Sequence, residues 1–136
     1  MKPEKQKRKY KPNSVPLDDR IKLSIISILI IGYGSYGLYK NDILIAFRTG
    51  RRFHRGPMLG NHFHNFSAWL VFIAIVCVAG SMIITIADHY DKRDNEIKYK
   101  QFARTAVIAG VAIFVLAFII GIYTRDVIPY NEAREK

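Results

Sequence analysis

Residues 68–87 read A-W-L-V-F-I-A-I-V-C-V-A-G-S-M-I-I-T-I-A, a stretch of 20 residues without a charge. At a rise of about 1.5 Å per residue, a helix of this length spans the roughly 30 Å hydrocarbon core of a bilayer. Inside lipid, every backbone donor and acceptor needs a partner within the segment, and a helix supplies it. The stretch therefore predicts a membrane-spanning helix.

Two further apolar runs flank this span. Residues 23–39 hold 17 uncharged residues, close to the lower limit for a span, and Lys22 and Lys40 at its ends can reach toward water. A signal peptide is the alternative, but the run is long for one and no A-x-A-like cleavage site follows it. Residues 106–123 supply the third run. The sequence predicts an all-α membrane protein with three transmembrane helices and a short basic connector between the first two.

The chain is expected to form a single integral membrane domain. Residues 43–47 are apolar but too short to cross a bilayer, so they would lie in the interface or form the edge of a strand. The third helix is expected to begin in water, because Asn95 can cap it and Glu96 lies in its first turn. The predicted segments are a flexible basic tail (1–15), the first span (20–40), a basic connector (41–65), the second span (66–88), a charged connector (89–103), the third span (104–124) and a polar tail (125–136).

Composition and charge fit a membrane chain better than a soluble one. Half of the residues are hydrophobic and the formal net charge is +10. In a soluble domain this charge would suggest nucleic acid, but in a membrane chain it indicates the positive-inside bias and contact with anionic lipid headgroups. Membrane lipids are therefore expected partners, and nucleic acid is not.

The distribution of Lys and Arg predicts a cytoplasmic amino end. Eight of the 21 precede Leu23, five lie in each connector and three follow Tyr123, so this orientation places 13 inside and eight outside. A two-span alternative, with the first run lying on the surface, would place 16 inside. We prefer three spans because residues 25–31 are apolar on every face, unlike an interfacial helix. The expected location is a bacterial inner membrane.

Small residues recur at helical spacing in each predicted span. Lipid offers no hydrophobic reason for helices to associate, so helices in a membrane associate through close backbone approach, which small side chains permit. Such faces can meet one another, a larger membrane protein or a second copy of the chain. The residues predicted to pack are Ser27, Gly34, Cys77, Ser81, Thr85, Gly110 and Gly121.

Two sets of polar residues are candidates for specific chemistry. His54, His62 and His64 share the first connector, and imidazoles at such spacing can bind zinc, copper or nickel, although solvated interfacial histidines are the commoner case. Asp88 lies at the end of the second span, where an ionisable group is costly, and it can pair with Arg104 at the start of the third.

Four arginines, three of them between Gly50 and Gly56, form the most distinctive polar stretch, and their guanidinium groups suit an anion or an acidic partner. They are Arg48, Arg51, Arg52 and Arg55. No catalytic constellation and no cofactor site is recognisable, so we expect no enzyme. The leading hypothesis is an accessory, assembly or interaction subunit of an inner-membrane complex, including immunity-type protection. The alternative is a small oligomeric transporter or metal-handling protein that uses the three histidines and Asp88.

Overall fold

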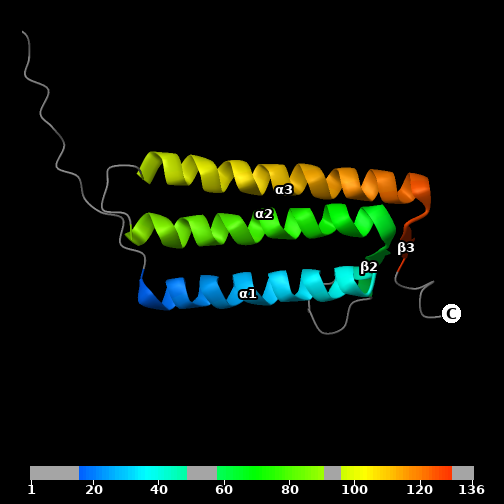
Figure 1. Cartoon of the computed structure of the whole chain (residues 1–136), viewed down its shortest axis with the longest axis horizontal. Coiled ribbons are helices and arrows are strands. Elements are labelled where there is room, and N and C mark those ends of the chain that lie inside the picture. The colour runs from blue at the N-terminus through cyan, green and yellow to red at the C-terminus, as the bar shows by residue number, and fades with distance from the viewer. Residues whose placement is uncertain (1–15, 49–57, 91–95, 130–136) are drawn as a thin grey trace, which may run out of the picture.

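The computed structural model of the chain describes residues 16–48, 58–90 and 96–129. Three long helices dominate these ranges and lie side by side (Figure 1). Each is long and apolar enough to cross a membrane, which confirms the predicted membrane protein built on three such helices. In chain order the elements are α1 (Leu17–Tyr39), β1 (Ile43–Arg48), β2 (Met58–Phe63), α2 (Asn65–Tyr90), α3 (Glu96–Thr124) and β3 (Val127–Pro129).

The ends of α1 follow from its sequence. Pro16 caps the helix with φ −54°, and Asp18 and Asp19 lie in the first turn, where the helix dipole favours negative charge. The helix ends where Asn41 adopts a left-handed conformation with φ 53°, which asparagine tolerates better than most residues. The backbone N–H of Asp42 then donates to the Gly37 carbonyl at 2.8 Å, so the chain turns directly into β1.

The second helix occupies the middle of the layer, with α1 and α3 on either side of it (Figure 1). Small residues form its contacts with both neighbours. A Cβ added to Gly110 of α3 would lie 3.2 Å from the Ala74 carbonyl oxygen and 3.2 Å from Cys77 Cβ, and one added to Gly34 of α1 would lie 3.0 Å from Phe72 Cδ2. The backbones of α2 and α3 therefore approach closely at Gly110, as expected for association inside lipid, and Gly34 lets the Phe72 side chain pack against the backbone of α1.

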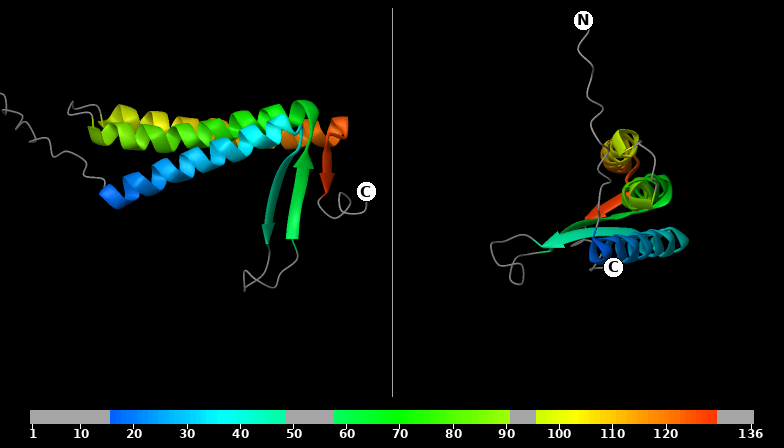
Figure 2. Two further views of the ribbon diagram at one scale, coloured as in Figure 1. Left: turned by 60° about the horizontal axis from the view of Figure 1, so that its bottom comes forward. Right: turned by 90° about the vertical axis from the view of Figure 1, so that its left-hand side faces the viewer.

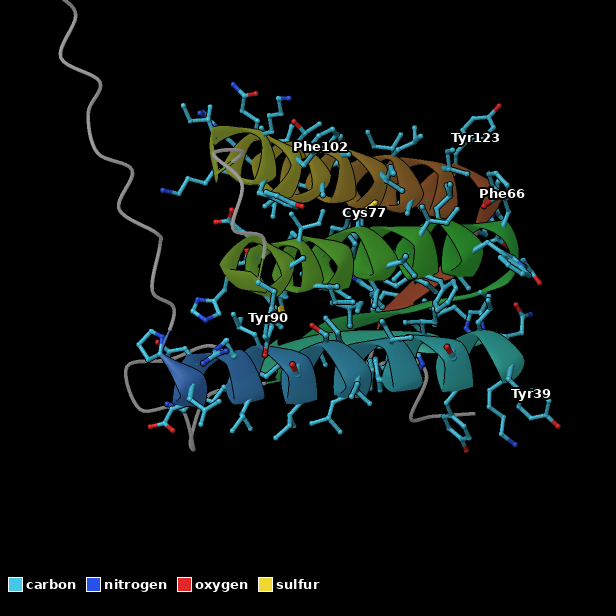
Figure 3. The ribbon with its side chains drawn as sticks, turned by 60° about the vertical axis from the view of Figure 1, so that its left-hand side comes forward. Tyr39, Phe66, Cys77, Tyr90, Phe102 and Tyr123 are labelled. Carbon is cyan, nitrogen blue, oxygen red and sulfur yellow. The ribbon has the colours of Figure 1, made fainter. Side chains whose placement is uncertain are left out.

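Aromatic side chains mark both ends of the helical layer (Figure 3). All are largely exposed, which suits rings that lie at the level of lipid headgroups. At one end are Tyr39, Phe66 and Tyr123, and at the other are Tyr90 and Phe102. Their positions agree with helices that cross a bilayer from one interface to the other.

A three-stranded antiparallel sheet projects from one end of the helices, in the order β1-β2-β3 (Figure 2). Its strands run across the helix axes, near the end where α1 and α3 finish and α2 begins. The strand edge considered for residues 43–47 is β1, a full strand of a hairpin with β2. Strand β3 follows α3 and was not expected from the sequence.

One row of side chains fastens the sheet to the helices. The pairing register aligns Ile43, Phe63 and Val127, and the first two are 0% and 1% exposed. The Phe63 ring lies 5.8 Å from the ring of Phe114 and 6.3 Å from that of Phe118, centroid to centroid. Since side chains alternate along a strand, the neighbouring row, which includes His62, projects from the opposite face of the sheet.

Candidate functional site at the sheet end of the helices

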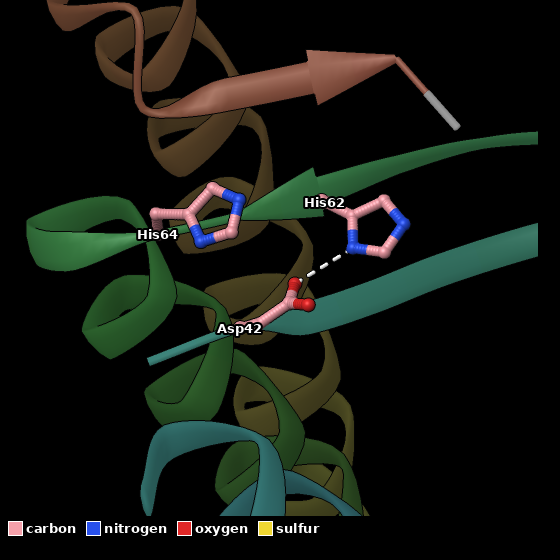
Figure 4. Close-up of side chains that lie close together, drawn as sticks. All are labelled: Asp42, His62 and His64. Atoms are coloured by element: carbon pink, nitrogen blue, oxygen red, sulfur yellow. Dashed lines mark hydrogen bonds and ion pairs between the residues drawn. The ribbon is translucent and has the colours of Figure 1, made fainter. Parts of the chain in front are cut away.

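Asp42, His62 and His64 come together at the junction between the sheet and the helices (Figure 4). His62 Nδ1 lies 2.8 Å from Asp42 Oδ1, and the His62 side chain is 17% exposed. The rings of His62 and His64 are nearly parallel, at 9°, with centroids 6.3 Å apart. One ligand atom from each residue lies within 4.8 Å of the others.

The strand register creates this cluster. Ile43 pairs with Phe63, so Asp42 comes directly before the pair on one strand and His64 directly after it on the other. His62 and His64 are two residues apart, which places both side chains on the same face of an extended chain. Residues from two parts of the sequence thus converge on one face.

His64 is held by a hydrogen bond of its own. Its Nδ1 lies 2.8 Å from the carbonyl oxygen of Asn41, and only a protonated ring nitrogen can donate to a carbonyl. In the neutral ring, the proton on Nδ1 leaves the lone pair on Nε2. The backbone of Asn41 therefore selects which nitrogen of His64 can accept a proton or bind a metal.

Asp126 lies beside the cluster and joins it to the end of α3. Asn65 Nδ2 donates to Asp126 Oδ1 at 2.9 Å, and Thr124 Oγ1 donates to Asp126 Oδ2 at 2.7 Å. These two hydrogen bonds, and then the charge of His64, lower the pKa of the Asp126 carboxyl below its usual range. Asp126 is therefore a negative group next to His64, whose backbone N–H donates to the Asp126 carbonyl at 2.9 Å.

The structure describes only part of the residues that the sequence singled out here. His54, Arg51, Arg52 and Arg55 lie outside the described residues, and Arg48 is the last residue of β1. Among the described residues, Asp42 is the third potential metal ligand beside His62 and His64, whereas the sequence had suggested His54. The sequence feature that could have indicated Asp42 is its position directly before the short apolar run 43–47. If that run pairs with residues 58–63 in a hairpin, Asp42 comes to lie beside the histidines.

Asp88 lies at the opposite end of the helices. It is 8% exposed and lines a cavity of about 150 Å³ together with Thr85, Tyr99, Lys100 and Ala103. Arg104, its predicted partner, is exposed, and within the described ranges no ion pair joins these two side chains. Lys100 is the basic residue of this cavity.

The hydroxyl groups among the predicted packing residues bond to their own helices. Ser27 Oγ donates to the Leu23 carbonyl at 2.8 Å, and Ser81 Oγ donates to the Val78 carbonyl at 2.7 Å. Thr85 Oγ1 donates to the Ser81 carbonyl at 2.9 Å. These hydroxyls are therefore satisfied without a partner across the helix interface, and their small size is what they contribute to packing.

An apolar cavity of about 330 Å³ opens beside α2, on the side that carries the sheet. Side chains from all three helices and from β1 line it: Ile30, Ile45, Val71, Ala74, Ile75, Val78, Gly110, Val111 and Phe114. A cavity of this character can hold an acyl chain or an apolar side chain, and it contains no group suited to catalysis.

Comparison of the chain with protein-family models, with curated proteins and with solved structures finds no match.

Proposed function

We propose that this chain is a non-enzymatic accessory, assembly or interaction subunit in a membrane, in keeping with the hypothesis from its sequence. In this proposal it works by packing a helix face against a helix of a second membrane-embedded chain. The complex would lie in a bacterial inner membrane, with the amino end of this chain in the cytoplasm. The arginine-rich connector between β1 and β2 would supply a second contact, to an anionic group.

The observation that carries the proposal is an open stripe on α2. Its positions follow one another in alternating steps of three and four residues over the whole helix: Phe66, Trp69, Ile73, Val76, Gly80, Ile83, Ala87 and Tyr90. The large side chains of this stripe are exposed, from 42% at Val76 to 67% at Tyr90. This spacing is the one that helices use when they wind around one another in left-handed pairs.

From Phe66 to Ala87 the stripe faces away from the rest of the molecule, whereas Tyr90 at its end turns toward α1, where Arg20 donates to the Tyr90 hydroxyl at 3.2 Å. The residues of α2 that line the apolar cavity, Val71, Ile75 and Val78, each lie two positions after a member of the stripe. At about 100° per residue, two positions amount to about 200°, slightly more than half a turn. The stripe is therefore on the side of α2 opposite the cavity and the sheet.

Gly80 at the middle of the stripe favours a protein partner over lipid alone. A Cβ added there would meet nothing within 4 Å, so the glycine serves no contact among the described residues. A glycine at the centre of an exposed face allows a second helix to approach closely. Lipid tails alone have no comparable requirement for a flat surface.

The transporter alternative has less support. Transport sites in membranes commonly use ionisable groups near the middle of the bilayer. In the described helices the Asp, Glu, Lys, Arg and His residues lie toward the helix ends, and Asp88 is two residues before Tyr90, the last residue of α2. This distribution is more typical of a protein that anchors and binds.

The experiment compares two open glycines. Gly80 lies on the stripe, and a Cβ at either Gly80 or Gly32 of α1 meets nothing within 4 Å, so a side chain at each position starts in open space. We expect Gly80→Leu to remove the larger species seen by native electrophoresis in mild detergent, and Gly32→Leu to retain it. A photo-crosslinker at position 80 should give an adduct whose mass tells a second copy from another protein.

The proposal fails if the wild-type chain runs as a single monomeric species in mild detergent and in lipid nanodiscs. It also fails if position 80 crosslinks only to lipid. An adduct formed by a crosslinker at position 80 supports the proposal if it depends on the partner. If the partner is a second copy, the adduct should be lost when that copy carries Gly80→Leu; if it is another protein, the adduct should be lost when that protein is deleted.

A further inference from the structure

The cluster of Asp42, His62 and His64 has the donor set of a metal site. Imidazole nitrogen and carboxylate oxygen are ligands that zinc and its neighbours in the first transition row accept. Two histidines and one carboxylate leave one tetrahedral position open, as in zinc sites that keep a water or accept a group from elsewhere. Two neutral imidazoles and one carboxylate would leave a bound divalent ion with a net charge of +1.

The spacing of the ligand atoms is close to what a metal ion requires. Bonds of about 2.0–2.1 Å in tetrahedral geometry hold neighbouring ligand atoms roughly 3.3–3.5 Å apart. The ligand atoms here lie within 4.8 Å of one another. Side-chain rotations that move these atoms by roughly 1–1.5 Å therefore bring them to the spacing of a metal site.

The surroundings orient the ligands in the way that metal sites use. His64 Nδ1 donates to the Asn41 carbonyl, which directs the lone pair to Nε2, and such outer hydrogen bonds commonly fix a metal-binding histidine. The β1–β2 register holds Asp42 next to His64. The cluster is partly exposed, with 17% of the His62 side chain and 39% of the Asp42 side chain accessible, so an ion can enter from water.

We propose that Asp42, His62 and His64, brought together by the pairing of β1 with β2 at the membrane interface, bind one divalent first-row transition-metal ion of the zinc class. This inference goes beyond the proposed subunit role and does not depend on it. In this proposal the ion fastens the hairpin to the ends of α1 and α2. Its fourth position is open to water or to a ligand from another chain.

The test is zinc binding by the full chain, carrying no polyhistidine tag, after treatment with a chelator and transfer into mild detergent. We expect about one Zn²⁺ per chain by titration against a chromophoric chelator. Losing a direct ligand costs more than the roughly 10–100-fold seen for outer-shell partners, so Asp42→Asn, His62→Ala and His64→Gln should each weaken affinity by about 100-fold or more. His89→Ala, at the opposite end of α2, should leave it unchanged.

A spectroscopic measurement separates ligation from folding. Co²⁺ bound in place of zinc should give the strong visible absorption of a four-coordinate site in the wild type. Asp42→Asn keeps the size and shape of the side chain, so it should preserve the circular dichroism of the helices while it changes the cobalt spectrum. A cobalt spectrum that Asp42→Asn leaves unaltered would overturn the assignment of Asp42.

Two other results would also overturn the proposal. The first is no stoichiometric Zn²⁺ or Co²⁺ binding by the folded wild-type chain. The second is binding that survives Asp42→Asn and is abolished by His54→Ala, which would show that the histidines of the connector form the site without the carboxylate.

Discussion

Asn41 and Asn65 exchange two hydrogen bonds across the junction between the first two helices. Asn41 Nδ2 donates to Asn65 Oδ1 at 2.9 Å, and the backbone N–H of Asn65 donates to Asn41 Oδ1 at 2.7 Å. Both residues have positive φ, 53° and 49°. The pair therefore joins the end of α1 to the start of α2, and it positions His64 and Asp126, which bond to its two members.

Two substitutions at Asn41 separate its side-chain bonds from its backbone conformation. Asn41→Ala removes both hydrogen bonds. It also leaves alanine at positive φ, where its Cβ is crowded and no polar side chain can bond to the nearby backbone. Asn41→Gly removes the same bonds but relieves the backbone. Net hydrogen bonds contribute about 0.5–1.5 kcal/mol each, and the left-handed conformation costs roughly 1–2 kcal/mol. We expect unfolding free energies to fall in the order wild type, Asn41→Gly, Asn41→Ala.

The measurement is unfolding in detergent, followed by circular dichroism, for these two variants and for Asn65→Gly. Asn65→Gly keeps the backbone N–H that donates to Asn41 Oδ1, but it loses the side-chain bonds to Asn41 and to Asp126. Each glycine variant therefore loses two hydrogen bonds, and the two should lose similar amounts of stability. Equal stability of Asn41→Ala and Asn41→Gly would show that the backbone conformation carries no cost. Wild-type stability of all three would show that the pair contributes nothing.

Glycines at contact and open positions should respond in opposite ways to alanine. A Cβ at Gly121 would overlap Val127 of β3 and would lie 3.2 Å from Ser67 Cβ, whereas one at Gly32 meets nothing within 4 Å. We expect Gly121→Ala to destabilise the chain by about 1–3 kcal/mol through overpacking. Gly32→Ala should be neutral or stabilise it by up to about 1 kcal/mol, because alanine favours a helix.

Thermal or denaturant unfolding of the two variants in the same detergent checks this prediction. Hydrogen exchange adds a local readout, because displacement of Val127 should expose the amides that pair β3 with β2 in Gly121→Ala alone. Equal protection of those amides in the two variants would argue against tight contact between α3 and β3.

The helices could be predicted because their cause is local. A run of uncharged residues long enough for a bilayer must satisfy its backbone internally, whatever its neighbours are. The predicted spans 20–40, 66–88 and 104–124 fall almost entirely within α1, α2 and α3. The observed third helix starts earlier, at Glu96, the residue that the sequence placed in its first turn.

The sheet could not be predicted to the same degree because its pairing is not local. Strand β3 pairs with β2 although α2 and α3 separate the two strands in the sequence, and β3 is only three residues long. The same cause hid part of the candidate site. His62 and His64 were visible as a pair in the sequence, but Asp42 joins them only through the β1–β2 register.

Acid should weaken the contact between the end of α3 and the start of α2. The pKa of the Asp126 carboxyl is lowered by its hydrogen bonds with Asn65 and Thr124. A lowered pKa in the folded state contributes stability that is present above the unfolded value of about 4, and that is lost as the pH falls through the folded value. We therefore expect the melting temperature to drop below about pH 4, modestly because the carboxyl borders water.

Variants isolate this group from other acids. Asp126→Asn should reduce the drop in melting temperature between pH 6 and pH 3, since it removes the titrating carboxyl. Thr124→Val removes one of the two hydrogen bonds to Asp126. Its drop in melting temperature should lie between that of Asp126→Asn and that of the wild type. A pH profile in Asp126→Asn identical to that of the wild type would assign the acid sensitivity to other residues.

Asp88 should be coupled energetically to Lys100 more strongly than to Arg104. Asp88 is 8% exposed and lines the same cavity as Lys100, whereas Arg104 does not line it; both basic side chains are exposed. Contacting or networked residues show interaction energies of about 0.5–3 kcal/mol in double-mutant cycles, whereas independent sites add within roughly 0.3–0.5 kcal/mol. We expect an interaction energy of about 0.5–3 kcal/mol between Asp88→Asn and Lys100→Gln. Between Asp88→Asn and Arg104→Gln we expect the effects to add within roughly 0.3–0.5 kcal/mol.

Both cycles are measured by unfolding at low and at high salt, because a partly buried charge pair is screened less than a surface pair. The Lys100 cycle should therefore retain most of its interaction energy in salt. A large Arg104 cycle with a small Lys100 cycle would support the pair that the sequence predicted, and it would require α3 to be rotated about its axis relative to α2. Small values in both cycles would mean that Asp88 is held by packing alone, and Asp88→Asn should then be nearly neutral.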